Sequence, residues 1–180
     1  MKAISRMNLG ELAAFVCSHL EGKGIQVVLS GGGCVAIYAS DRYSSMDLDF
    51  VERLRVTRRK LATALAEIGF VAKERYFTHP DTDFYLEFPS GPLAVGGEPV
   101  LAVEELHLET GTLLLLSPTD CVKDRLAAFY HWNDRQCLQQ AVWVARERQV
   151  DWGDLERWSW QEGELEKFAE FRRMFEKSSA

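Results

Sequence analysis

The sequence predicts an α+β fold in which a mixed-sheet core is followed by a C-terminal lobe of helices. Up to about residue 116, short β-branched or alternating segments are interspersed with amphipathic ones, which is typical of strands and helices around one sheet. From residue 117 onward almost every segment has helical periodicity, and this part holds all five tryptophans. We therefore divide the chain into a core of residues 1–116 and a helical lobe of residues 117–180.

The first part of the core reads as helix, strand, helix and strand. Apolar residues from Leu9 to Leu20 share one helical face, and Gly22 is a suitable end for this helix. The β-branched segment 25–30 predicts a buried strand, after which a helix begins at the glycines 31–33. Segment 46–51 alternates apolar and acidic residues, which predicts a half-buried strand.

The rest of the core reads as one helix and four strands. Thr57 is a suitable N-cap for a helix that ends near Gly69. Segments 70–78 and 83–89 predict two strands that are joined by a turn at residues 79–82. Residues 91–99 predict a loop, and the segments on either side of Gly111 predict two more strands.

The helical lobe has a strong start signal in the tetrapeptide Ser-Pro-Thr-Asp. Ser117 is a suitable N-cap, Pro118 suits the first helical position, and Asp120 places an acid in the first turn. We predict helices over about 118–131, 135–149, 152–160 and 163–177. The cluster of three tryptophans at residues 152–160 is expected to form core between helices.

Composition limits the classes of protein that this chain can be. The chain has 180 residues and a formal net charge of −6, which disfavours indiscriminate coating of nucleic acid. Its four cysteines match no zinc or disulfide spacing, so we expect free thiols in a reducing compartment. No apolar run approaches the roughly 20 residues that cross a bilayer. We expect a cytoplasmic protein without a membrane partner.

Three consecutive glycines, Gly31, Gly32 and Gly33, lie between a predicted strand and a predicted helix. A backbone without Cβ atoms can approach a ligand closely, and the N–H groups at a helix start attract anions. The pattern completes neither a P-loop nor a dinucleotide fingerprint. We predict a phosphate-binding turn; an ordinary tight turn is the alternative.

Two acids follow at a spacing that suits a hard cation. Asp47 and Asp49 lie on one face of a strand, with Cα atoms about 6.6 Å apart. Magnesium typically takes one or two carboxylates together with phosphate oxygens. A solvated strand face is the alternative for the acids alone. Glycines and acids together, in this order, favour a site for a nucleoside triphosphate and Mg²⁺.

A third carboxylate is expected on a neighbouring strand. In segment 83–89 Glu87 shares a face with Asp83, while Leu86 belongs to the apolar face. Asp83 is the rival candidate, but it lies nearer to the predicted turn. We therefore favour Glu87 as the third acid.

These residues resemble the nucleotidyltransferase (polymerase-beta-like) superfamily, and within it small bacterial toxins of the abortive-infection AbiEii type. The resemblance covers about residues 25–140 and consists of the glycines, a serine before two alternating aspartates, and a later acid. Ser45 matches the serine of that pattern. In the helical lobe, Lys123 matches a basic position and Asp134 a later acidic position.

The resemblance implies a nucleotidyltransferase core that uses Mg²⁺ to move a nucleoside monophosphate from an NTP to an RNA or protein hydroxyl. Asp47, Asp49 and Glu87 would hold the metal, and Glu87 would help to deprotonate the acceptor. Lys123 would neutralise triphosphate charge, unless it is an ordinary exposed helix lysine. A toxin–antitoxin role with a cognate antitoxin protein is part of the same expectation.

Other interpretations remain open from the sequence. Five basic residues lie in segment 53–60, where they are either a solvated surface or a contact for the phosphates of an RNA acceptor. Two further classes of function compete with the enzyme: a nucleotide-binding module with little turnover, and a protein-interaction module that uses the helical lobe.

Overall fold

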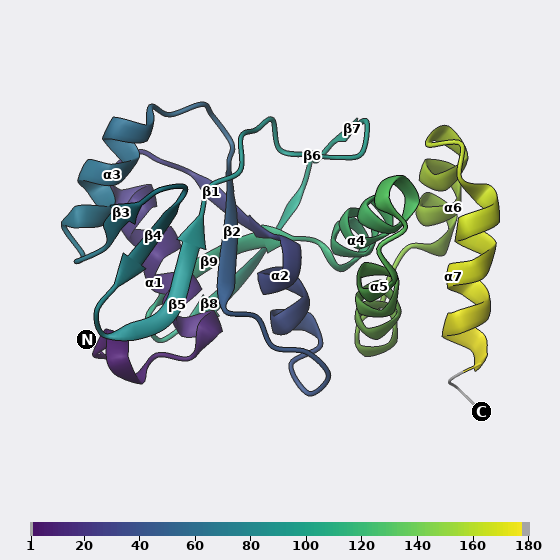
Figure 1. Cartoon of the computed structure of the whole chain (residues 1–180), viewed down its shortest axis with the longest axis horizontal. Coiled ribbons are helices and arrows are strands. Elements are labelled where there is room, and N and C mark those ends of the chain that lie inside the picture. Colours follow the sequence, from purple (N-terminus) through teal and green to yellow (C-terminus); the bar gives the residue numbers. More distant parts are fainter. Residues whose placement is uncertain (1, 178–180) are drawn as a thin grey trace.

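A computed structural model describes residues 2–177 and shows a β-sheet half joined to a helical half (Figure 1). The sheet half ends with the last strand of the chain, at Leu116, and the four helices that follow make up the helical half. The sheet half contains α1 (Leu9–Gly22), α2 (Gly31–Tyr38) and α3 (Arg58–Ala66). The helical half contains α4 (Pro118–Trp132), α5 (Arg135–Glu147), α6 (Trp152–Gln161) and α7 (Leu165–Lys177). The strands are β1 (Val27–Ser30), β2 (Asp47–Glu52), β3 (Val71–Lys73), β4 (Tyr76–His79), β5 (Thr82–Glu87), β6 (Ala94–Val95), β7 (Glu98–Pro99), β8 (Val103–Leu108) and β9 (Gly111–Leu116).

Seven strands form one sheet, and it is mixed, as the sequence predicted. Their order is β3-β4-β5-β2-β1-β9-β8, with parallel pairing of β2 to β5 and of β1 to β9. The remaining neighbours pair antiparallel. Strands β1 and β2 therefore lie inside the sheet. The glycines 31–33 directly follow β1, and Asp47 and Asp49 lie on β2.

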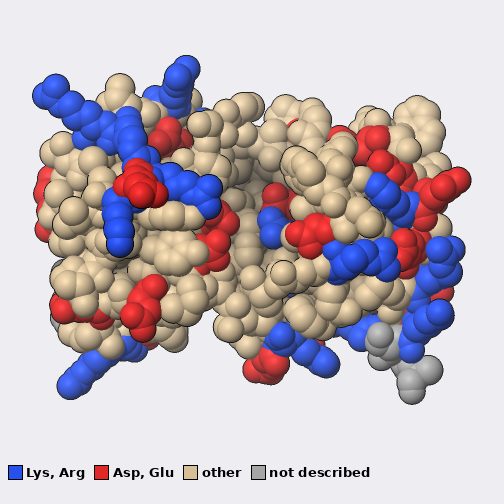
Figure 2. Space-filling view, viewed as in Figure 1, with Lys and Arg blue, Asp and Glu red and all other residues tan. Residues whose placement is uncertain are grey.

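Helix α1 covers the sheet, and α2 connects the sheet half to the helical half. Helix α1 begins with a capping box between Asn8 and Glu11 and packs on β9, β1 and β8. Helix α2 packs on β2 and also contacts α4 and α5. Helices α6 and α7 lie at the far end from the sheet (Figure 1). The space-filling view shows a hollow between the sheet half and the helical half (Figure 2).

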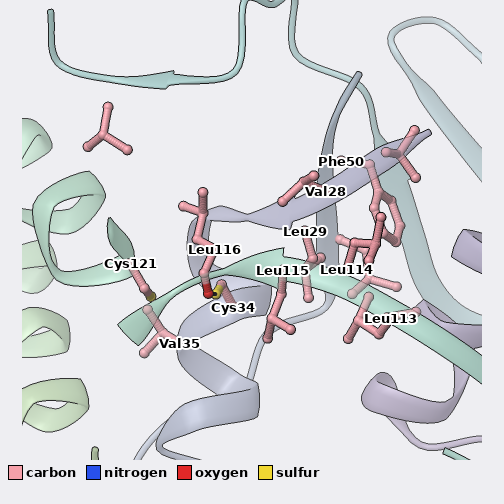
Figure 3. Close-up of a cluster of buried hydrophobic side chains, with 14 of the residues drawn as sticks. Val28, Leu29, Cys34, Val35, Phe50, Leu113, Leu114, Leu115, Leu116 and Cys121 are labelled. Carbon is pink, nitrogen blue, oxygen red and sulfur yellow. Dashed lines mark hydrogen bonds between the residues drawn. The ribbon is translucent and has the colours of Figure 1, made fainter. Parts of the chain in front are cut away.

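The junction between the two halves is an apolar core around the end of β9. Cys34 on α2, Leu116 on β9 and Cys121 on α4 are almost fully buried there (Figure 3). All four cysteines are buried free thiols, as expected. Because α4 starts directly from the last residues of β9, this core fixes where the helical lobe begins relative to the sheet.

The element boundaries follow the local signals closely. Thr57 caps α3 by accepting the Lys60 N–H, and Ser117 caps α4 by accepting the Asp120 N–H. The turn predicted at residues 79–82 separates β4 from β5. No helix within residues 2–177 is both long and apolar enough to cross a lipid bilayer.

Two sequence predictions in the sheet half are wrong. Segment 70–78 is two strands, β3 and β4, because the chain turns at Glu74, which has a φ of +53°. Glutamate rarely adopts this conformation, so no local signal marked the turn. Residues 91–99 were predicted to be loop, but they contain the hairpin β6–β7 around Gly96 and Gly97. A Gly-Gly pair is a recognised signal for such a turn.

The tryptophans have mixed roles. Trp158 is fully buried, and Trp152 stacks on Phe171, so these two form core between helices as predicted. Trp160 is 67 % exposed and Trp132 is 78 % exposed. The prediction that the cluster at residues 152–160 forms core is therefore wrong for Trp160. Trp132 lies outside that cluster.

Candidate active site

Three carboxylates lie on one face of the paired strands β2 and β5. In this parallel pair Asp49 is directly opposite Glu87, and Asp47 is opposite Tyr85. Residues that are paired in register project to the same side of a sheet, whereas Leu48 and Leu86 project into the core and are fully buried. The structure thus places Asp47, Asp49 and Glu87 on one face of the sheet, as their alternation indicated.

Gly31 places the start of α2 against these acids. Ser30 pairs with Asp49 in the β1–β2 ladder, so the turn into α2 begins beside that carboxylate. Gly31 has a φ of +61°, and a Cβ on it would overlap the Asp49 carboxylate. The position therefore requires glycine for two reasons, a left-handed backbone and a close approach to an acid.

The other two glycines serve different contacts. A Cβ on Gly32 would lie 3.0 Å from Tyr43 Oη and 3.4 Å from Ser45 Oγ. A Cβ on Gly33 would press on Leu29 and on the backbone oxygen of Asp47. Gly32 thus faces the polar loop before β2, whereas Gly33 allows α2 to pack closely on the sheet.

Ser45 orients the first aspartate. Its hydroxyl donates a short hydrogen bond to Asp47 Oδ1 and lies 3.1 Å from the Asp47 backbone oxygen. Ser45 is buried, with 5 % of its surface exposed. The Ser30 hydroxyl instead donates to the backbone oxygen of Asp49 and leaves α2 without a side-chain cap. The N–H groups of the first turn of α2 are therefore not satisfied by a capping side chain.

The acids form an electrostatically strained group. Burial, together with the negative charges of Asp47 and Glu87, raises the pKa of Asp49 to about 7, against the opposing effect of Arg125. Glu87 has a partner of its own in Arg75, whose Nε lies 3.4 Å away, but Arg75 is largely exposed. The site thus concentrates more negative charge than the neighbouring cations neutralise.

Arg125 and Asp124 on α4 lie near enough to this acidic group to act on it electrostatically from the helical half. Both contribute to the electrostatic environment of Asp49. The Arg125 guanidinium bonds to Asp124, Cys137 and Gln140, so it is held between α4 and α5. Arg125 was not selected from the sequence. Its offset of two positions places it on another side of the helix from Lys123, but no local signal shows which side lies toward the acids.

The structure places Lys123 in a different environment from the one expected. Its Nζ lies 2.6 Å from Asp154, 3.1 Å from Glu98 and 3.6 Å from Asp120, and its side chain is 3 % exposed. It therefore joins α4 to α6 and to the β6–β7 hairpin. The alternative of an exposed helix lysine is wrong, and the expectation of a lysine available to a triphosphate is not supported by these contacts.

Asp134 begins the next helix, as its position suggested. It caps α5 by accepting the Cys137 N–H at 3.0 Å, and this hydrogen bond lowers the pKa of its carboxyl. Arg125 also lowers that pKa, which places Asp134 in the electrostatic neighbourhood of the same arginine. Its observed role is that of a helix cap.

The donor atoms of the acidic group suit a divalent cation, although the side chains do not converge on one point. Within residues 2–177, no three His, Cys, Asp or Glu side chains are close enough to form a ready metal-binding cluster. The available donors are carboxylate oxygens, which magnesium prefers. Their mutual repulsion around Asp49 is the electrostatic condition that a cation would relieve. On these observations the residues fit Mg²⁺.

Comparisons with known proteins show the class of fold. No protein-family model matches the sequence, and no match was found among curated protein sequences. The crystal structure of an antigenic nucleotidyltransferase-like protein from Paracoccidioides brasiliensis superposes with a TM-score of 0.56 and 16 % identity, covering 77 % of this chain and 75 % of the other. The chain therefore has a nucleotidyltransferase-like fold.

A second solved structure was also found. It is the solution structure of the antibiotic-resistance factor ANT(2'')-Ia, which superposes with a TM-score of 0.46 and 12 % identity, covering 86 % of this chain and 95 % of the other. Neither structure is described as AbiEii-like, so that closer resemblance stays a prediction.

Proposed function

We propose that this protein is a magnesium-dependent nucleotidyltransferase that moves a nucleoside monophosphate from an NTP to a hydroxyl group of an RNA or protein acceptor. The observation that carries the proposal is the group of Asp47, Asp49 and Glu87 on paired strands, directly beside the Gly31 turn. Acids alone suit many surfaces, and a glycine turn alone suits many loops. Their contact through Asp49 and Gly31 favours a site where phosphate and a divalent cation meet.

The acids and the helix start divide the work of binding. Asp47, Asp49 and Glu87 would hold the metal, which supplies Lewis-acid stabilisation of the entering and leaving oxygens. The uncapped N–H groups at the start of α2 favour phosphate oxygens. Ser45 fixes the Asp47 carboxylate by its hydrogen bond, so this acid is oriented before any ligand arrives.

Arg125 is the basic residue that we assign to the triphosphate in place of Lys123. It lies on α4 near enough to lower the pKa of Asp49, and a guanidinium can donate two parallel hydrogen bonds to a phosphate. Its contacts with Gln140 and Cys137 are long, at 3.4 and 3.6 Å, so it can exchange them for stronger ones. Lys123, with three carboxylate neighbours, would position the hairpin and the helical lobe.

Glu87 is the acid that we propose to accept the proton of the attacking hydroxyl. It lies at the end of β5, and 23 % of its side chain is exposed, so an acceptor can reach it. Arg75 Nε lies 3.4 Å from Glu87 Oε1, so it can hold this side chain in place beside the other two acids. A role as one component of a toxin–antitoxin pair is compatible with this chemistry and belongs to the proposal.

Transfer of label tests the function directly. The protein is incubated with Mg²⁺, each α-³²P-labelled NTP and total RNA or total protein, and the labelled product is digested to identify the acceptor. We expect label from one or more NTPs on a hydroxyl of the acceptor, with pyrophosphate released.

Asp47→Asn should abolish this transfer. Asp83→Asn is the matched control, because Asp83 is an exposed acid at the other end of β5 and should retain full activity. Nucleotide binding without transfer by the wild-type protein would favour the nucleotide-binding module instead. Absence of both would contradict the proposed function.

A further inference from the structure

A second charged surface lies beyond the C-terminal end of β2, the strand that carries Asp47 and Asp49. Arg53, Arg55, Arg58, Arg59 and Lys60 are all exposed and lie around the N-terminus of α3. We call these five residues the basic patch. Figure 2 shows Lys and Arg side chains gathered over α3 and the loop before it, at the upper left. The chain as a whole is acidic, with a net charge of −6, so this concentration of positive charge is local.

The basic patch is not neutralised by the protein itself. Within residues 2–177, none of its five cations forms a salt bridge, although Lys23 at its edge pairs with Glu67. Arg58 is partly engaged, because it donates to the Glu74 backbone oxygen and lies over the Phe77 ring. Five cations that repel one another, three of them in the first turn of a helix with a positive N-terminus, cost free energy. A polyanion would offset this cost.

Two hollows adjoin the basic patch. One of about 660 Å³ lies between Arg53, Arg55 and Arg58 on one side and the loop 88–92 on the other. The second, of about 690 Å³, lies on the other side of the α3 start and is lined by Arg59 and Lys60. The two hollows flank one turn of helix, so the charged surface is extended rather than a pocket for one small anion.

The position of the basic patch relates it to the acids. Strands β2 and β5 run parallel, and the residues that follow each of them, from Arg53 and from Phe88 respectively, line the first hollow. From Asp49 to Arg53 there are four residues along β2, or about 13 Å at the usual rise of a strand. A single linear polyanion can therefore reach both surfaces.

We propose that the basic patch binds the phosphate backbone of an RNA acceptor strand whose terminal hydroxyl lies at the Asp47–Asp49–Glu87 group. The role of the bound RNA as the acceptor rests on the proposed function. RNA binding by the basic patch does not depend on it. Phosphate contacts of this kind position a strand without reading its sequence. Exposed, unpaired arginines and a lysine are the side chains that make them.

Binding of a fluorescein-labelled, 20-nucleotide single-stranded RNA tests the proposal. Fluorescence anisotropy is measured in EDTA at several salt concentrations, so neither metal nor NTP is required. With four phosphate contacts, log K should fall with log salt with a slope of about −2.8, since each contact on a single strand contributes about −0.7. Each charge-reversed pair, Arg53→Glu/Arg55→Glu and Arg59→Glu/Lys60→Glu, should weaken binding at least tenfold and reduce the slope by about 1.4.

The control reverses an equal amount of charge elsewhere. Arg172→Glu/Arg173→Glu changes two exposed arginines on α7 in the helical half, and should bind RNA within twofold of wild type. Arg53→Gln/Arg55→Gln gives a smaller loss in the same direction without introducing acids. Equal affinities for wild type, patch variants and control would overturn the proposal, and so would an equal loss in the control.

The result separates this inference from the proposed function. Asp47→Asn should bind the RNA probe as wild type does, because the acids are not part of the basic patch. Patch-dependent binding without any label transfer would support the docking surface and contradict the nucleotidyltransferase. Label transfer to RNA that the patch variants retain in full would contradict the docking surface alone.

Discussion

Lys123 offers the sharpest test of how the helical lobe is held. Replacement by Met keeps most of the length and the apolar stem of the side chain but removes the ammonium that lies near Asp154, Glu98 and Asp120. These three acids come from α6, β7 and α4, so the substitution leaves like charges at the point where three elements meet. We expect Lys123→Met to destabilise the fold and to loosen the β6–β7 hairpin.

The size of the effect follows from the surroundings of the ammonium. Removing one partner of a buried ion pair costs about 3–5 kcal/mol. Here the three acids are 20–33 % exposed, and Arg157 still pairs with Glu98 and Asp154. Water and Arg157 reduce the penalty, so we expect about 2–3 kcal/mol and a fall in melting temperature of about 5–10 °C for a chain of this size.

Thermal unfolding and NTP titration together decide between two roles for Lys123. Lys73→Met is the control, because Lys73 is an exposed residue on the edge strand β3 and its loss should change stability by no more than about 0.5 kcal/mol. NTP affinity is measured well below the melting temperature of each variant. An unchanged melting temperature with a 10-fold or greater loss of NTP affinity would refute our reasoning and assign Lys123 to the triphosphate.

Four further outcomes are expected. Hydrogen bonds from Arg157 lower the pKa of Glu98, and those from Lys123 and Arg157 outweigh burial to lower the pKa of Asp154. The stability that these carboxylates contribute is therefore present above their unfolded pKa of about 4 and lost below it. The difference in unfolding free energy between wild type and Lys123→Met should accordingly shrink from pH 7 to pH 3 in denaturant titrations. Arg125→Lys should weaken NTP binding by about 1.5–3 kcal/mol in calorimetry, because an ammonium lacks the guanidinium fork, while Arg135→Lys on α5 should not. Gly31→Ala should abolish transfer and lower the melting temperature, because its Cβ would overlap Asp49; equal activity would show that the turn does not contact the acids. In EDTA the Asp47→Asn protein should melt no lower than wild type, and Mg²⁺ should raise the melting temperature of wild type only; a Mg²⁺ response in the variant would contradict the metal role of Asp47.

The sequence was a good guide where one local signal determines structure. Alternation placed Asp47 and Asp49 on one face, and the residues Ser117 and Thr57 marked helix starts that the structure has. These features depend on neighbours within a few positions, so they can be read along the chain. A third acid on a neighbouring strand was expected, but the parallel pairing that sets Glu87 opposite Asp49 was not predicted, because it depends on segments about 40 residues apart.

The Gly-Gly signal of the β6–β7 hairpin was overlooked, whereas the other errors came from features without a local signal. The turn at Glu74 uses a backbone conformation that favours glycine or asparagine, so segment 70–78 looked continuous. On α4, both Lys123 and Arg125 are basic and lie near the start of the lobe. Which one faces the acids depends on the rotation of the helix about its axis, and that rotation is set by contacts with α6 and the hairpin that no short stretch reveals.

The arrangement of α4 has a consequence for how nucleotide and acceptor are brought together. Lys123 ties this helix to α6 and to the β6–β7 hairpin, while Arg125, two residues later, faces the acids on the sheet. The same helix starts directly from β9, which pairs with the strand that precedes Gly31. The cation and the glycine turn are therefore held by one continuous framework, and a loss of the Lys123 contacts should displace Arg125 as well. Lys123→Met should thus weaken NTP binding less than Arg125→Lys does, and only in proportion to its effect on stability.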